Sequence, residues 1–136
     1  MRGCTRLTDR SVAVVATLCP HLIQLILKGC GNLTDAAIIE VANRCPMLAQ
    51  LNVGYCGNLT DAAIIAVANK CPMLTELHVE YCDNLTDAAI TEVTTECPIL
   101  AELFVWGCGK VMAATLKDIK ARLRNLYIYS YYDDLE

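Results

Sequence analysis

Cysteine is the residue type in this sequence that most readily does chemistry. The 136 residues include nine cysteines, enough to form disulfides, ligate zinc or supply a nucleophile. They fall into two evenly spaced columns with a common 26-residue period, namely Cys4, Cys30, Cys56, Cys82 and Cys108, and Cys19, Cys45, Cys71 and Cys97. The gaps between successive cysteines alternate between 15 and 11 residues. No Cys-x-x-Cys pair occurs, so the short spacing of zinc ligands is missing.

The regular spacing of the cysteines favours a structural role over a chemical one. A reactive thiol needs a neighbouring base or cation, whereas both columns are expected to face the core in every repeat, with each thiol bonded to loop backbone. The odd number of cysteines and the lack of an export signal disfavour disulfides. We therefore expect no catalytic residue, no metal, no cofactor and no enzymatic activity. An enzyme that uses cysteine is the alternative class.

His78, with Glu76 and Glu80, is the second group that has the residue types for proton transfer. The spacing of two residues puts all three side chains on one face of a strand. An imidazole with carboxylate partners can serve as a general base, which would be His78 here. The simpler interpretation, which we prefer, is a strand that carries three polar side chains on its exposed face.

The 26-residue period extends far beyond cysteine. Residues 32–57 and 58–83 are identical at 19 of 26 positions. Three further columns keep the period, namely Pro20, Pro46, Pro72 and Pro98; Leu22, Leu48, Leu74 and Leu100; and Leu25, Leu51, Leu77 and Leu103. A period of this length indicates a solenoid, in which each repeat buries its apolar side against its neighbours.

Each repeat contains the patterns of one short strand and one short helix. In "LAQLNVGYC" (48–56) the apolar residues alternate around Leu51 and Val53, which is typical of a strand. In "LTDAAIIEVANRCP" (33–46) Thr34 or Asp35 occupies the place of a helix cap, apolar residues follow at helical spacing, and Pro46 ends the helix. Stacked repeats of this kind predict one curved parallel sheet with helices on its outer side.

The pattern C-P-x-L-x-x-L-x-V-x-x-C-x-x-L-T-D-x-x-I resembles the cysteine-containing leucine-rich repeat of the F-box/leucine-rich-repeat type. The resemblance implies an α/β leucine-rich-repeat solenoid, with the sheet on the concave side and the helices on the convex side. It further implies a binding protein that recognises substrates for an SCF-type ubiquitin ligase. The F-box that precedes the repeats in that family is absent from these residues, so ligase subunits would bind through another segment. The alternative is a scaffold, regulatory or defence module with no ubiquitin link.

In such a repeat the side chains between the inward leucines point to the concave surface, and they are our candidate protein-binding residues. They are Gln24, Ile26 and Lys28; Gln50, Asn52 and Gly54; Glu76, His78 and Glu80; and Glu102, Phe104 and Trp106. Three of the seven differences between the two copies fall here. A constant frame with a varied face is what protein recognition requires; simple drift of exposed positions is the alternative.

The last third of the sequence is rich in aromatic residues. Aligning "LRNLYIYSY" with "LAELFVWGC" predicts Tyr127 beside Phe104 and Tyr129 beside Trp106, on the same concave face. Large exposed aromatic side chains are typical anchors of protein interfaces. The alternative is that they shield the end of the stack.

We expect residues 1–136 to form a single domain of about five 26-residue repeats. "MRGC" aligns with "LKGC" at residues 27–30, so the first repeat begins inside a strand. An uncapped edge favours self-association or a place in a longer array. Residues 110–136 lack the Leu-Thr-Asp motif and have a more charged helix, so we interpret them as an atypical C-terminal cap.

Charge and hydropathy narrow the range of partners. The net charge is −4 and the basic residues are dispersed, so the sequence has no basic stripe for nucleic acid. No apolar run is long enough to span a membrane, and the N-terminus lacks a secretory layout. We expect a protein partner in the cytoplasm, with the nucleus as the alternative.

Overall fold

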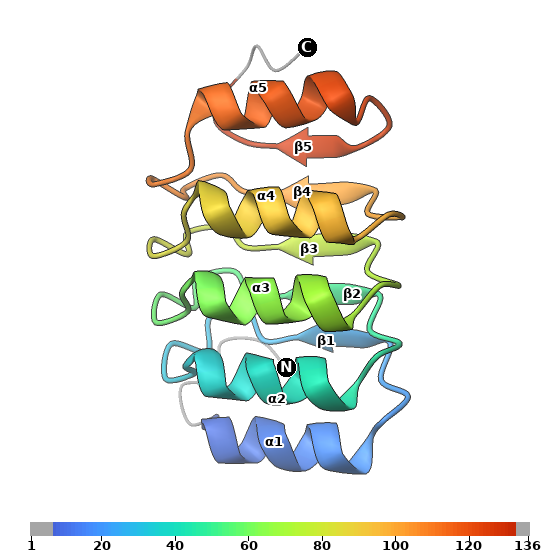
Figure 1. Ribbon diagram of the computed structural model, residues 1–136. Coiled ribbons are helices and arrows are strands. Elements are labelled where there is room, and N and C mark those ends of the chain that lie inside the picture. Colours follow the sequence, from blue (N-terminus) through green and yellow to red (C-terminus); the bar gives the residue numbers. More distant parts are fainter. Residues whose placement is uncertain (1–6, 133–136) are drawn as a thin grey trace.

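The computed structural model describes residues 7–132, in which five helices alternate with five strands (Figure 1). The helices are α1 (Asp9–Leu18), α2 (Asp35–Arg44), α3 (Asp61–Lys70), α4 (Asp87–Glu96) and α5 (Ala113–Arg122). The strands are β1 (Gln24–Ile26), β2 (Gln50–Asn52), β3 (Glu76–His78), β4 (Glu102–Phe104) and β5 (Tyr127–Tyr129). The partial strand expected at residues 1–4, with the uncapped edge inferred from it, lies outside the described residues.

The five strands form one parallel sheet in chain order, and the helices stack in a second row along one of its faces (Figure 1). Strands β1 to β4 pair in a constant register of one full repeat, so that each residue lies beside its copy in the next repeat. The central side chains of the strands are apolar and point toward the helices; Leu51, Leu77 and Leu103 are at most 1% exposed. This arrangement confirms the predicted α/β leucine-rich-repeat solenoid.

The helices begin and end where the repeat pattern indicates. Thr60 is the N-cap of α3 and its hydroxyl accepts from the Ala62 amide. Cys71 is the C-cap, and its N–H bonds the Val67 carbonyl before Pro72 stops the helix. Ile64 and Val67 lie at helical spacing and are fully buried. An equivalent helix recurs in each repeat, so one local pattern builds the whole helical row.

Aspartates at the first helical position join neighbouring repeats, which was not foreseen from the sequence. The Asp61 carboxylate accepts from the Thr86 amide at 2.8 Å and from the Thr86 hydroxyl. The same contact joins Asp9 to Thr34 and Asp35 to Thr60. The sequence indicated a carboxylate beside the positive helix end. The structure adds that this carboxylate also fixes the start of the next helix.

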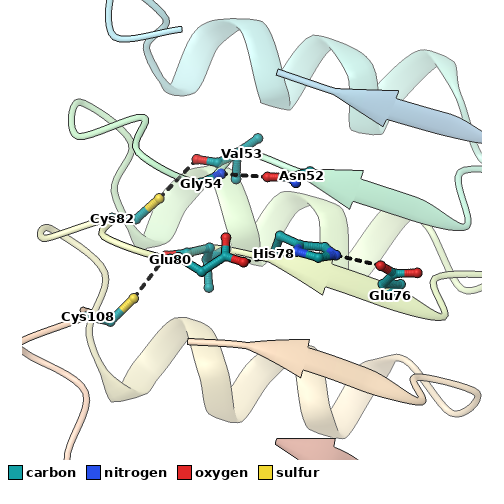
Figure 2. A network of polar contacts seen from close by, with 9 residues as sticks. Asn52, Val53, Gly54, Glu76, His78, Glu80, Cys82 and Cys108 are labelled. Carbon is teal, nitrogen blue, oxygen red and sulfur yellow. Dashed lines mark hydrogen bonds and ion pairs between the residues drawn. The ribbon is translucent and has the colours of Figure 1, made fainter. Parts of the chain in front are cut away.

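The cysteine thiols also bond across repeats. Cys82 Sγ donates to the Val53 carbonyl at 3.2 Å, and Cys108 Sγ donates to the Val79 carbonyl at 3.0 Å (Figure 2). The eight cysteines of residues 7–132 are free thiols, and seven of them are buried. The expectation that cysteine faces the core in every repeat is wrong at Cys19, which is exposed. Its copies are covered by the preceding helix, and no described helix lies before α1.

The last repeat is one residue shorter than the others, and this corrects the predicted alignment of its tyrosines. Tyr127 pairs with Glu102, one position short of a full repeat, and Tyr129 pairs with Phe104. The alignment that placed Tyr127 beside Phe104 and Tyr129 beside Trp106 is therefore wrong. That alignment matched Leu126 to Leu103, the central leucine of β4. In the structure the Leu126 amide instead donates to the Leu123 carbonyl, in the turn that precedes β5. The role of residues 110–136 as a closing cap stays a prediction.

Candidate protein-binding face

The face of the sheet away from the helices, here called the sheet face, collects the predicted binding residues in three columns. The first column is Gln24, Gln50, Glu76, Glu102 and Tyr127; the second is Ile26, Asn52, His78, Phe104 and Tyr129; the third is Lys28, Gly54, Glu80 and Trp106. The constant register sets the members of each strand column side by side. Side chains from distant parts of the sequence thereby form one surface.

Aromatic rings stack along the second column from β3 to β5. The ring centroids of His78 and Phe104 are 3.9 Å apart, with planes inclined by 6°. Those of Phe104 and Tyr129 are 4.3 Å apart, with planes inclined by 8°. The ring centroids of Phe104 and Trp106 are 5.6 Å apart, with planes inclined by 72° in an edge-to-face arrangement. Such contacts hold large side chains in one orientation, which lowers the entropy lost when a partner binds.

His78 lies between Glu76, at the start of β3, and Glu80, two residues beyond the end of the strand (Figure 2). Its Nε2 is 2.5 Å from Oε1 of Glu76, and its Nδ1 is 3.0 Å from Oε1 of Glu80. Carboxylates only accept, so both contacts are hydrogen bonds when both ring nitrogens carry a proton. The prediction that all three side chains are exposed is wrong for Glu80, which is 4% exposed.

Glu80 is buried because the neighbouring strand leaves room for it. Gly54, at the same column position, has no side chain, and the carboxylate occupies that space. Within residues 7–132 its Oε2 atom is buried and has no hydrogen-bond partner. An unpaired buried carboxylate oxygen costs stability. Gly54 and Glu80 were predicted to lie in one column of the concave surface, and the structure shows that they pack as a pair.

A second row of rings at the ends of the strands was missed by the sequence reasoning. Tyr55 and Tyr81 stack with centroids 4.7 Å apart, and the Lys28 ammonium lies 5.4 Å from the Tyr55 ring centroid. The Tyr81 and Tyr131 hydroxyls are hydrogen-bonded, which raises the pKa of Tyr81 to about 12. Tyr55 and Tyr81 share one column of the repeat with Gly29 and Gly107, and both tyrosines have positive φ, at 63° and 56°. The glycines at the equivalent positions of other repeats were the available signal for this unusual backbone conformation.

The buried cysteines are poor nucleophiles. Burial raises the pKa of Cys71 to about 12 and those of Cys56 and Cys108 to about 11. These thiols stay protonated at neutral pH, and the reactive form of cysteine is the thiolate. Within residues 7–132 no group of three or more histidine, cysteine, aspartate or glutamate side chains is placed to hold a metal ion. No helix in the same range has the length and hydropathy to cross a membrane.

Comparison with known proteins supports the repeat and the fold. Residues 70–92 match a family model described as a leucine-rich repeat. No curated protein matches the chain. Among solved structures, a chain from the crystal structure of the Rad7 and Elc1 complex in yeast is similar, with 26% identity and a TM-score of 0.78. The match covers 93% of this chain and 31% of that one. The chain therefore has the fold of a leucine-rich-repeat solenoid, and one of its repeats matches the leucine-rich-repeat model.

Proposed function

We propose that the sheet face binds a protein partner, and that this binding serves substrate recognition for an SCF-type ubiquitin ligase. The observation that carries the first part is the aromatic stack. Large rings are held in fixed orientations on an open surface, where Tyr129 at the end of the stack is 40% exposed. Aromatic anchors of this kind dominate the binding energy of protein interfaces.

The ubiquitin link rests on the resemblance of the repeat to the F-box/leucine-rich-repeat type. The similar yeast chain was solved in a complex, and this chain spans about a third of its length. In a ligase of this type the repeats would bind the substrate, and a segment outside this sequence would bind the ligase subunits. The alternative is a leucine-rich-repeat scaffold, regulatory or defence protein that uses the same face without a ligase.

The experiment compares partners captured from cell lysate by the native chain and by a Phe104→Ala, Trp106→Ala, Tyr129→Ala variant. The control is a Met47→Ala, Met73→Ala, Ile99→Ala variant, which removes three exposed apolar side chains from the turns after the helices. Circular dichroism verifies that all three proteins are folded. We expect the native chain and the control to retain the same protein and the aromatic variant to lose it.

Ligase subunits in the same eluate support the ubiquitin role, and their absence beside a retained partner favours the scaffold role. Equal capture by all three proteins contradicts the assignment of the sheet face.

A further inference from the structure

The sheet face carries an unbalanced negative charge between β3 and β4. The register places Glu76 directly opposite Glu102, and like charges at opposed positions of neighbouring strands repel each other. Glu76 has a partner in His78, but the Glu102 carboxylate makes no ion pair or hydrogen bond within residues 7–132. Glu102 is only partly buried, so a partner can reach its carboxylate.

The lysines and arginines of residues 7–132 do not neutralise these carboxylates. Glu76, Glu80 and Glu102 contribute three negative charges, against at most one positive charge on His78. In the described part of the chain no lysine or arginine is paired with any of the three. Lys28 lies over the Tyr55 ring. Lys120 bonds the Arg124 and Leu126 carbonyls, and its ammonium lies 5.5 Å from the Tyr127 ring centroid without pairing with Glu102. The surface between β3 and β4 is therefore complementary to a cation supplied from outside.

Aromatic side chains beside these carboxylates favour arginine over lysine. Tyr127 lies directly opposite Glu102 on β5, and Phe104 is two residues further along β4. A guanidinium is planar, bonds a carboxylate through two N–H groups and stacks on aromatic rings, whereas an ammonium is a compact point charge. Glu76 and Glu102 offer the carboxylates. Tyr127 offers an exposed ring that already attracts a cation, because the Lys120 ammonium lies 5.5 Å from its centroid.

An apolar cavity lies further along β4, between the last two repeats. Its lining includes Val105, Trp106, Val111, Leu116, Tyr131 and Tyr132. Trp106 follows Glu102 by four residues, roughly 13 Å in extended chain. A partner segment lying along β4 can therefore reach both the carboxylates and the cavity.

We propose that the sheet face binds an extended protein segment through an arginine and a large apolar residue about four positions away. The arginine lies between Glu76 and Glu102, and the apolar side chain packs at Trp106. This inference rests on the proposed function, because it names the chemistry of the partner for the same face. It requires no further cofactor and no reaction.

The test is a selection of random short peptides displayed on phage, with the native chain as bait. We expect the enriched peptides to share an arginine and an aliphatic or aromatic residue about four positions from it. For one synthetic peptide from that set, we expect about tenfold weaker binding after Glu102→Gln, and the same loss when citrulline replaces its arginine. Glu96→Gln makes the same charge change at the exposed end of α4 and should leave the affinity unchanged.

Enriched peptides without arginine, or no enrichment above a selection without bait, contradict the proposal. So does equal binding by the native chain and the Glu102→Gln variant. If arginine-free peptides still lose affinity for the Phe104→Ala, Trp106→Ala, Tyr129→Ala variant, the sheet face binds proteins but the arginine inference is wrong. If Glu102→Gln dissociates a dimer of the native chain in sedimentation measurements, a second copy covers the face and the inference is also wrong.

Discussion

The carboxylate of Glu80 occupies the space above Gly54 on the neighbouring strand. A Cβ atom at residue 54 would come within 2.6 Å of Oε2 of Glu80 and within 3.2 Å of Oδ1 of Asn52. The same Glu80 side chain is held from its other side by Nδ1 of His78. Because Glu80 is confined in this way, the residue that fits at position 54 depends on the side chain at position 80.

Replacing Gly54 by alanine should therefore destabilise the protein. We expect Gly54→Ala to lower the free energy of unfolding by about 1–2 kcal/mol, because the added methyl displaces the buried carboxylate. Urea unfolding followed by circular dichroism measures the loss. In a Glu80→Ala background the same change should cost much less. An equal cost in both backgrounds would show that the contact with Glu80 is not the cause.

Gly107 provides a second test of close packing, at the aromatic row. It has φ +79°, and a Cβ there would lie 2.5 Å from the Tyr81 ring. Gly107→Ala should cost about 1–3 kcal/mol, because alanine is strained at positive φ and meets the ring. Gly109→Ala is the matched control, since nothing lies within 4 Å of its added Cβ. Similar thermal midpoints for both variants would contradict this packing.

The aspartate contacts between helices should contribute measurably to stability. Asp61→Ala removes two hydrogen bonds to Thr86 and leaves its amide without that acceptor. We expect a loss of about 1–3 kcal/mol in urea unfolding. Asp83→Ala, in an exposed turn, should change the free energy of unfolding by less than about 0.5 kcal/mol. If Asp83→Ala costs as much as Asp61→Ala, general charge effects explain the loss better than the contact between repeats.

The thiols should differ sharply in reactivity. Iodoacetamide applied to the native protein should alkylate Cys19, which is exposed, and leave Cys71 unmodified until urea unfolds the chain. Peptide mapping by mass spectrometry identifies the modified residues. Alkylation of Cys71 at the same rate as Cys19 in the folded protein would contradict the burial of that column.

The raised pKa values of the thiols also predict loss of stability in alkali. Burial raises the pKa of Cys71 from 9.0 to about 12, so the folded state keeps a proton that the unfolded state loses above pH 9. The stabilisation is complete below pH 9 and declines between pH 9 and pH 12. In urea unfolding at pH 8 and pH 10, Cys71→Ala should lose less stability with rising pH than the native chain. Identical pH dependence of the two proteins would refute this assignment.

The repeat pattern was enough to predict the solenoid, because the register follows directly from a constant period. Leu51, Leu77 and Leu103 recur once per repeat in the sequence and pair in the sheet. The same pattern identified the columns of the sheet face. It failed in the last repeat, because the one-residue shortening before Tyr127 cannot be located by matching leucines alone.

Other features depend on contacts between repeats, which the pattern of a single repeat does not contain. Within its own repeat, the sequence around Asp61 indicates only that this residue starts a helix. Its hydrogen bond to Thr86 forms between stacked repeats. Glu80 reads as an exposed strand residue, and its burial depends on the missing side chain at Gly54. Neighbouring positions in a column should therefore be interpreted together.

Photo-crosslinking from the sheet face tests the central claim most directly. p-Benzoylphenylalanine is placed at residue 129, where it retains an aromatic ring, or at residue 73, an exposed position in the turn after α3. Both proteins are irradiated in cell lysate, and crosslinked partners are identified by mass spectrometry. We predict that a partner protein is crosslinked from residue 129 and not from residue 73. Crosslinking from residue 73 alone would contradict recognition through the sheet face.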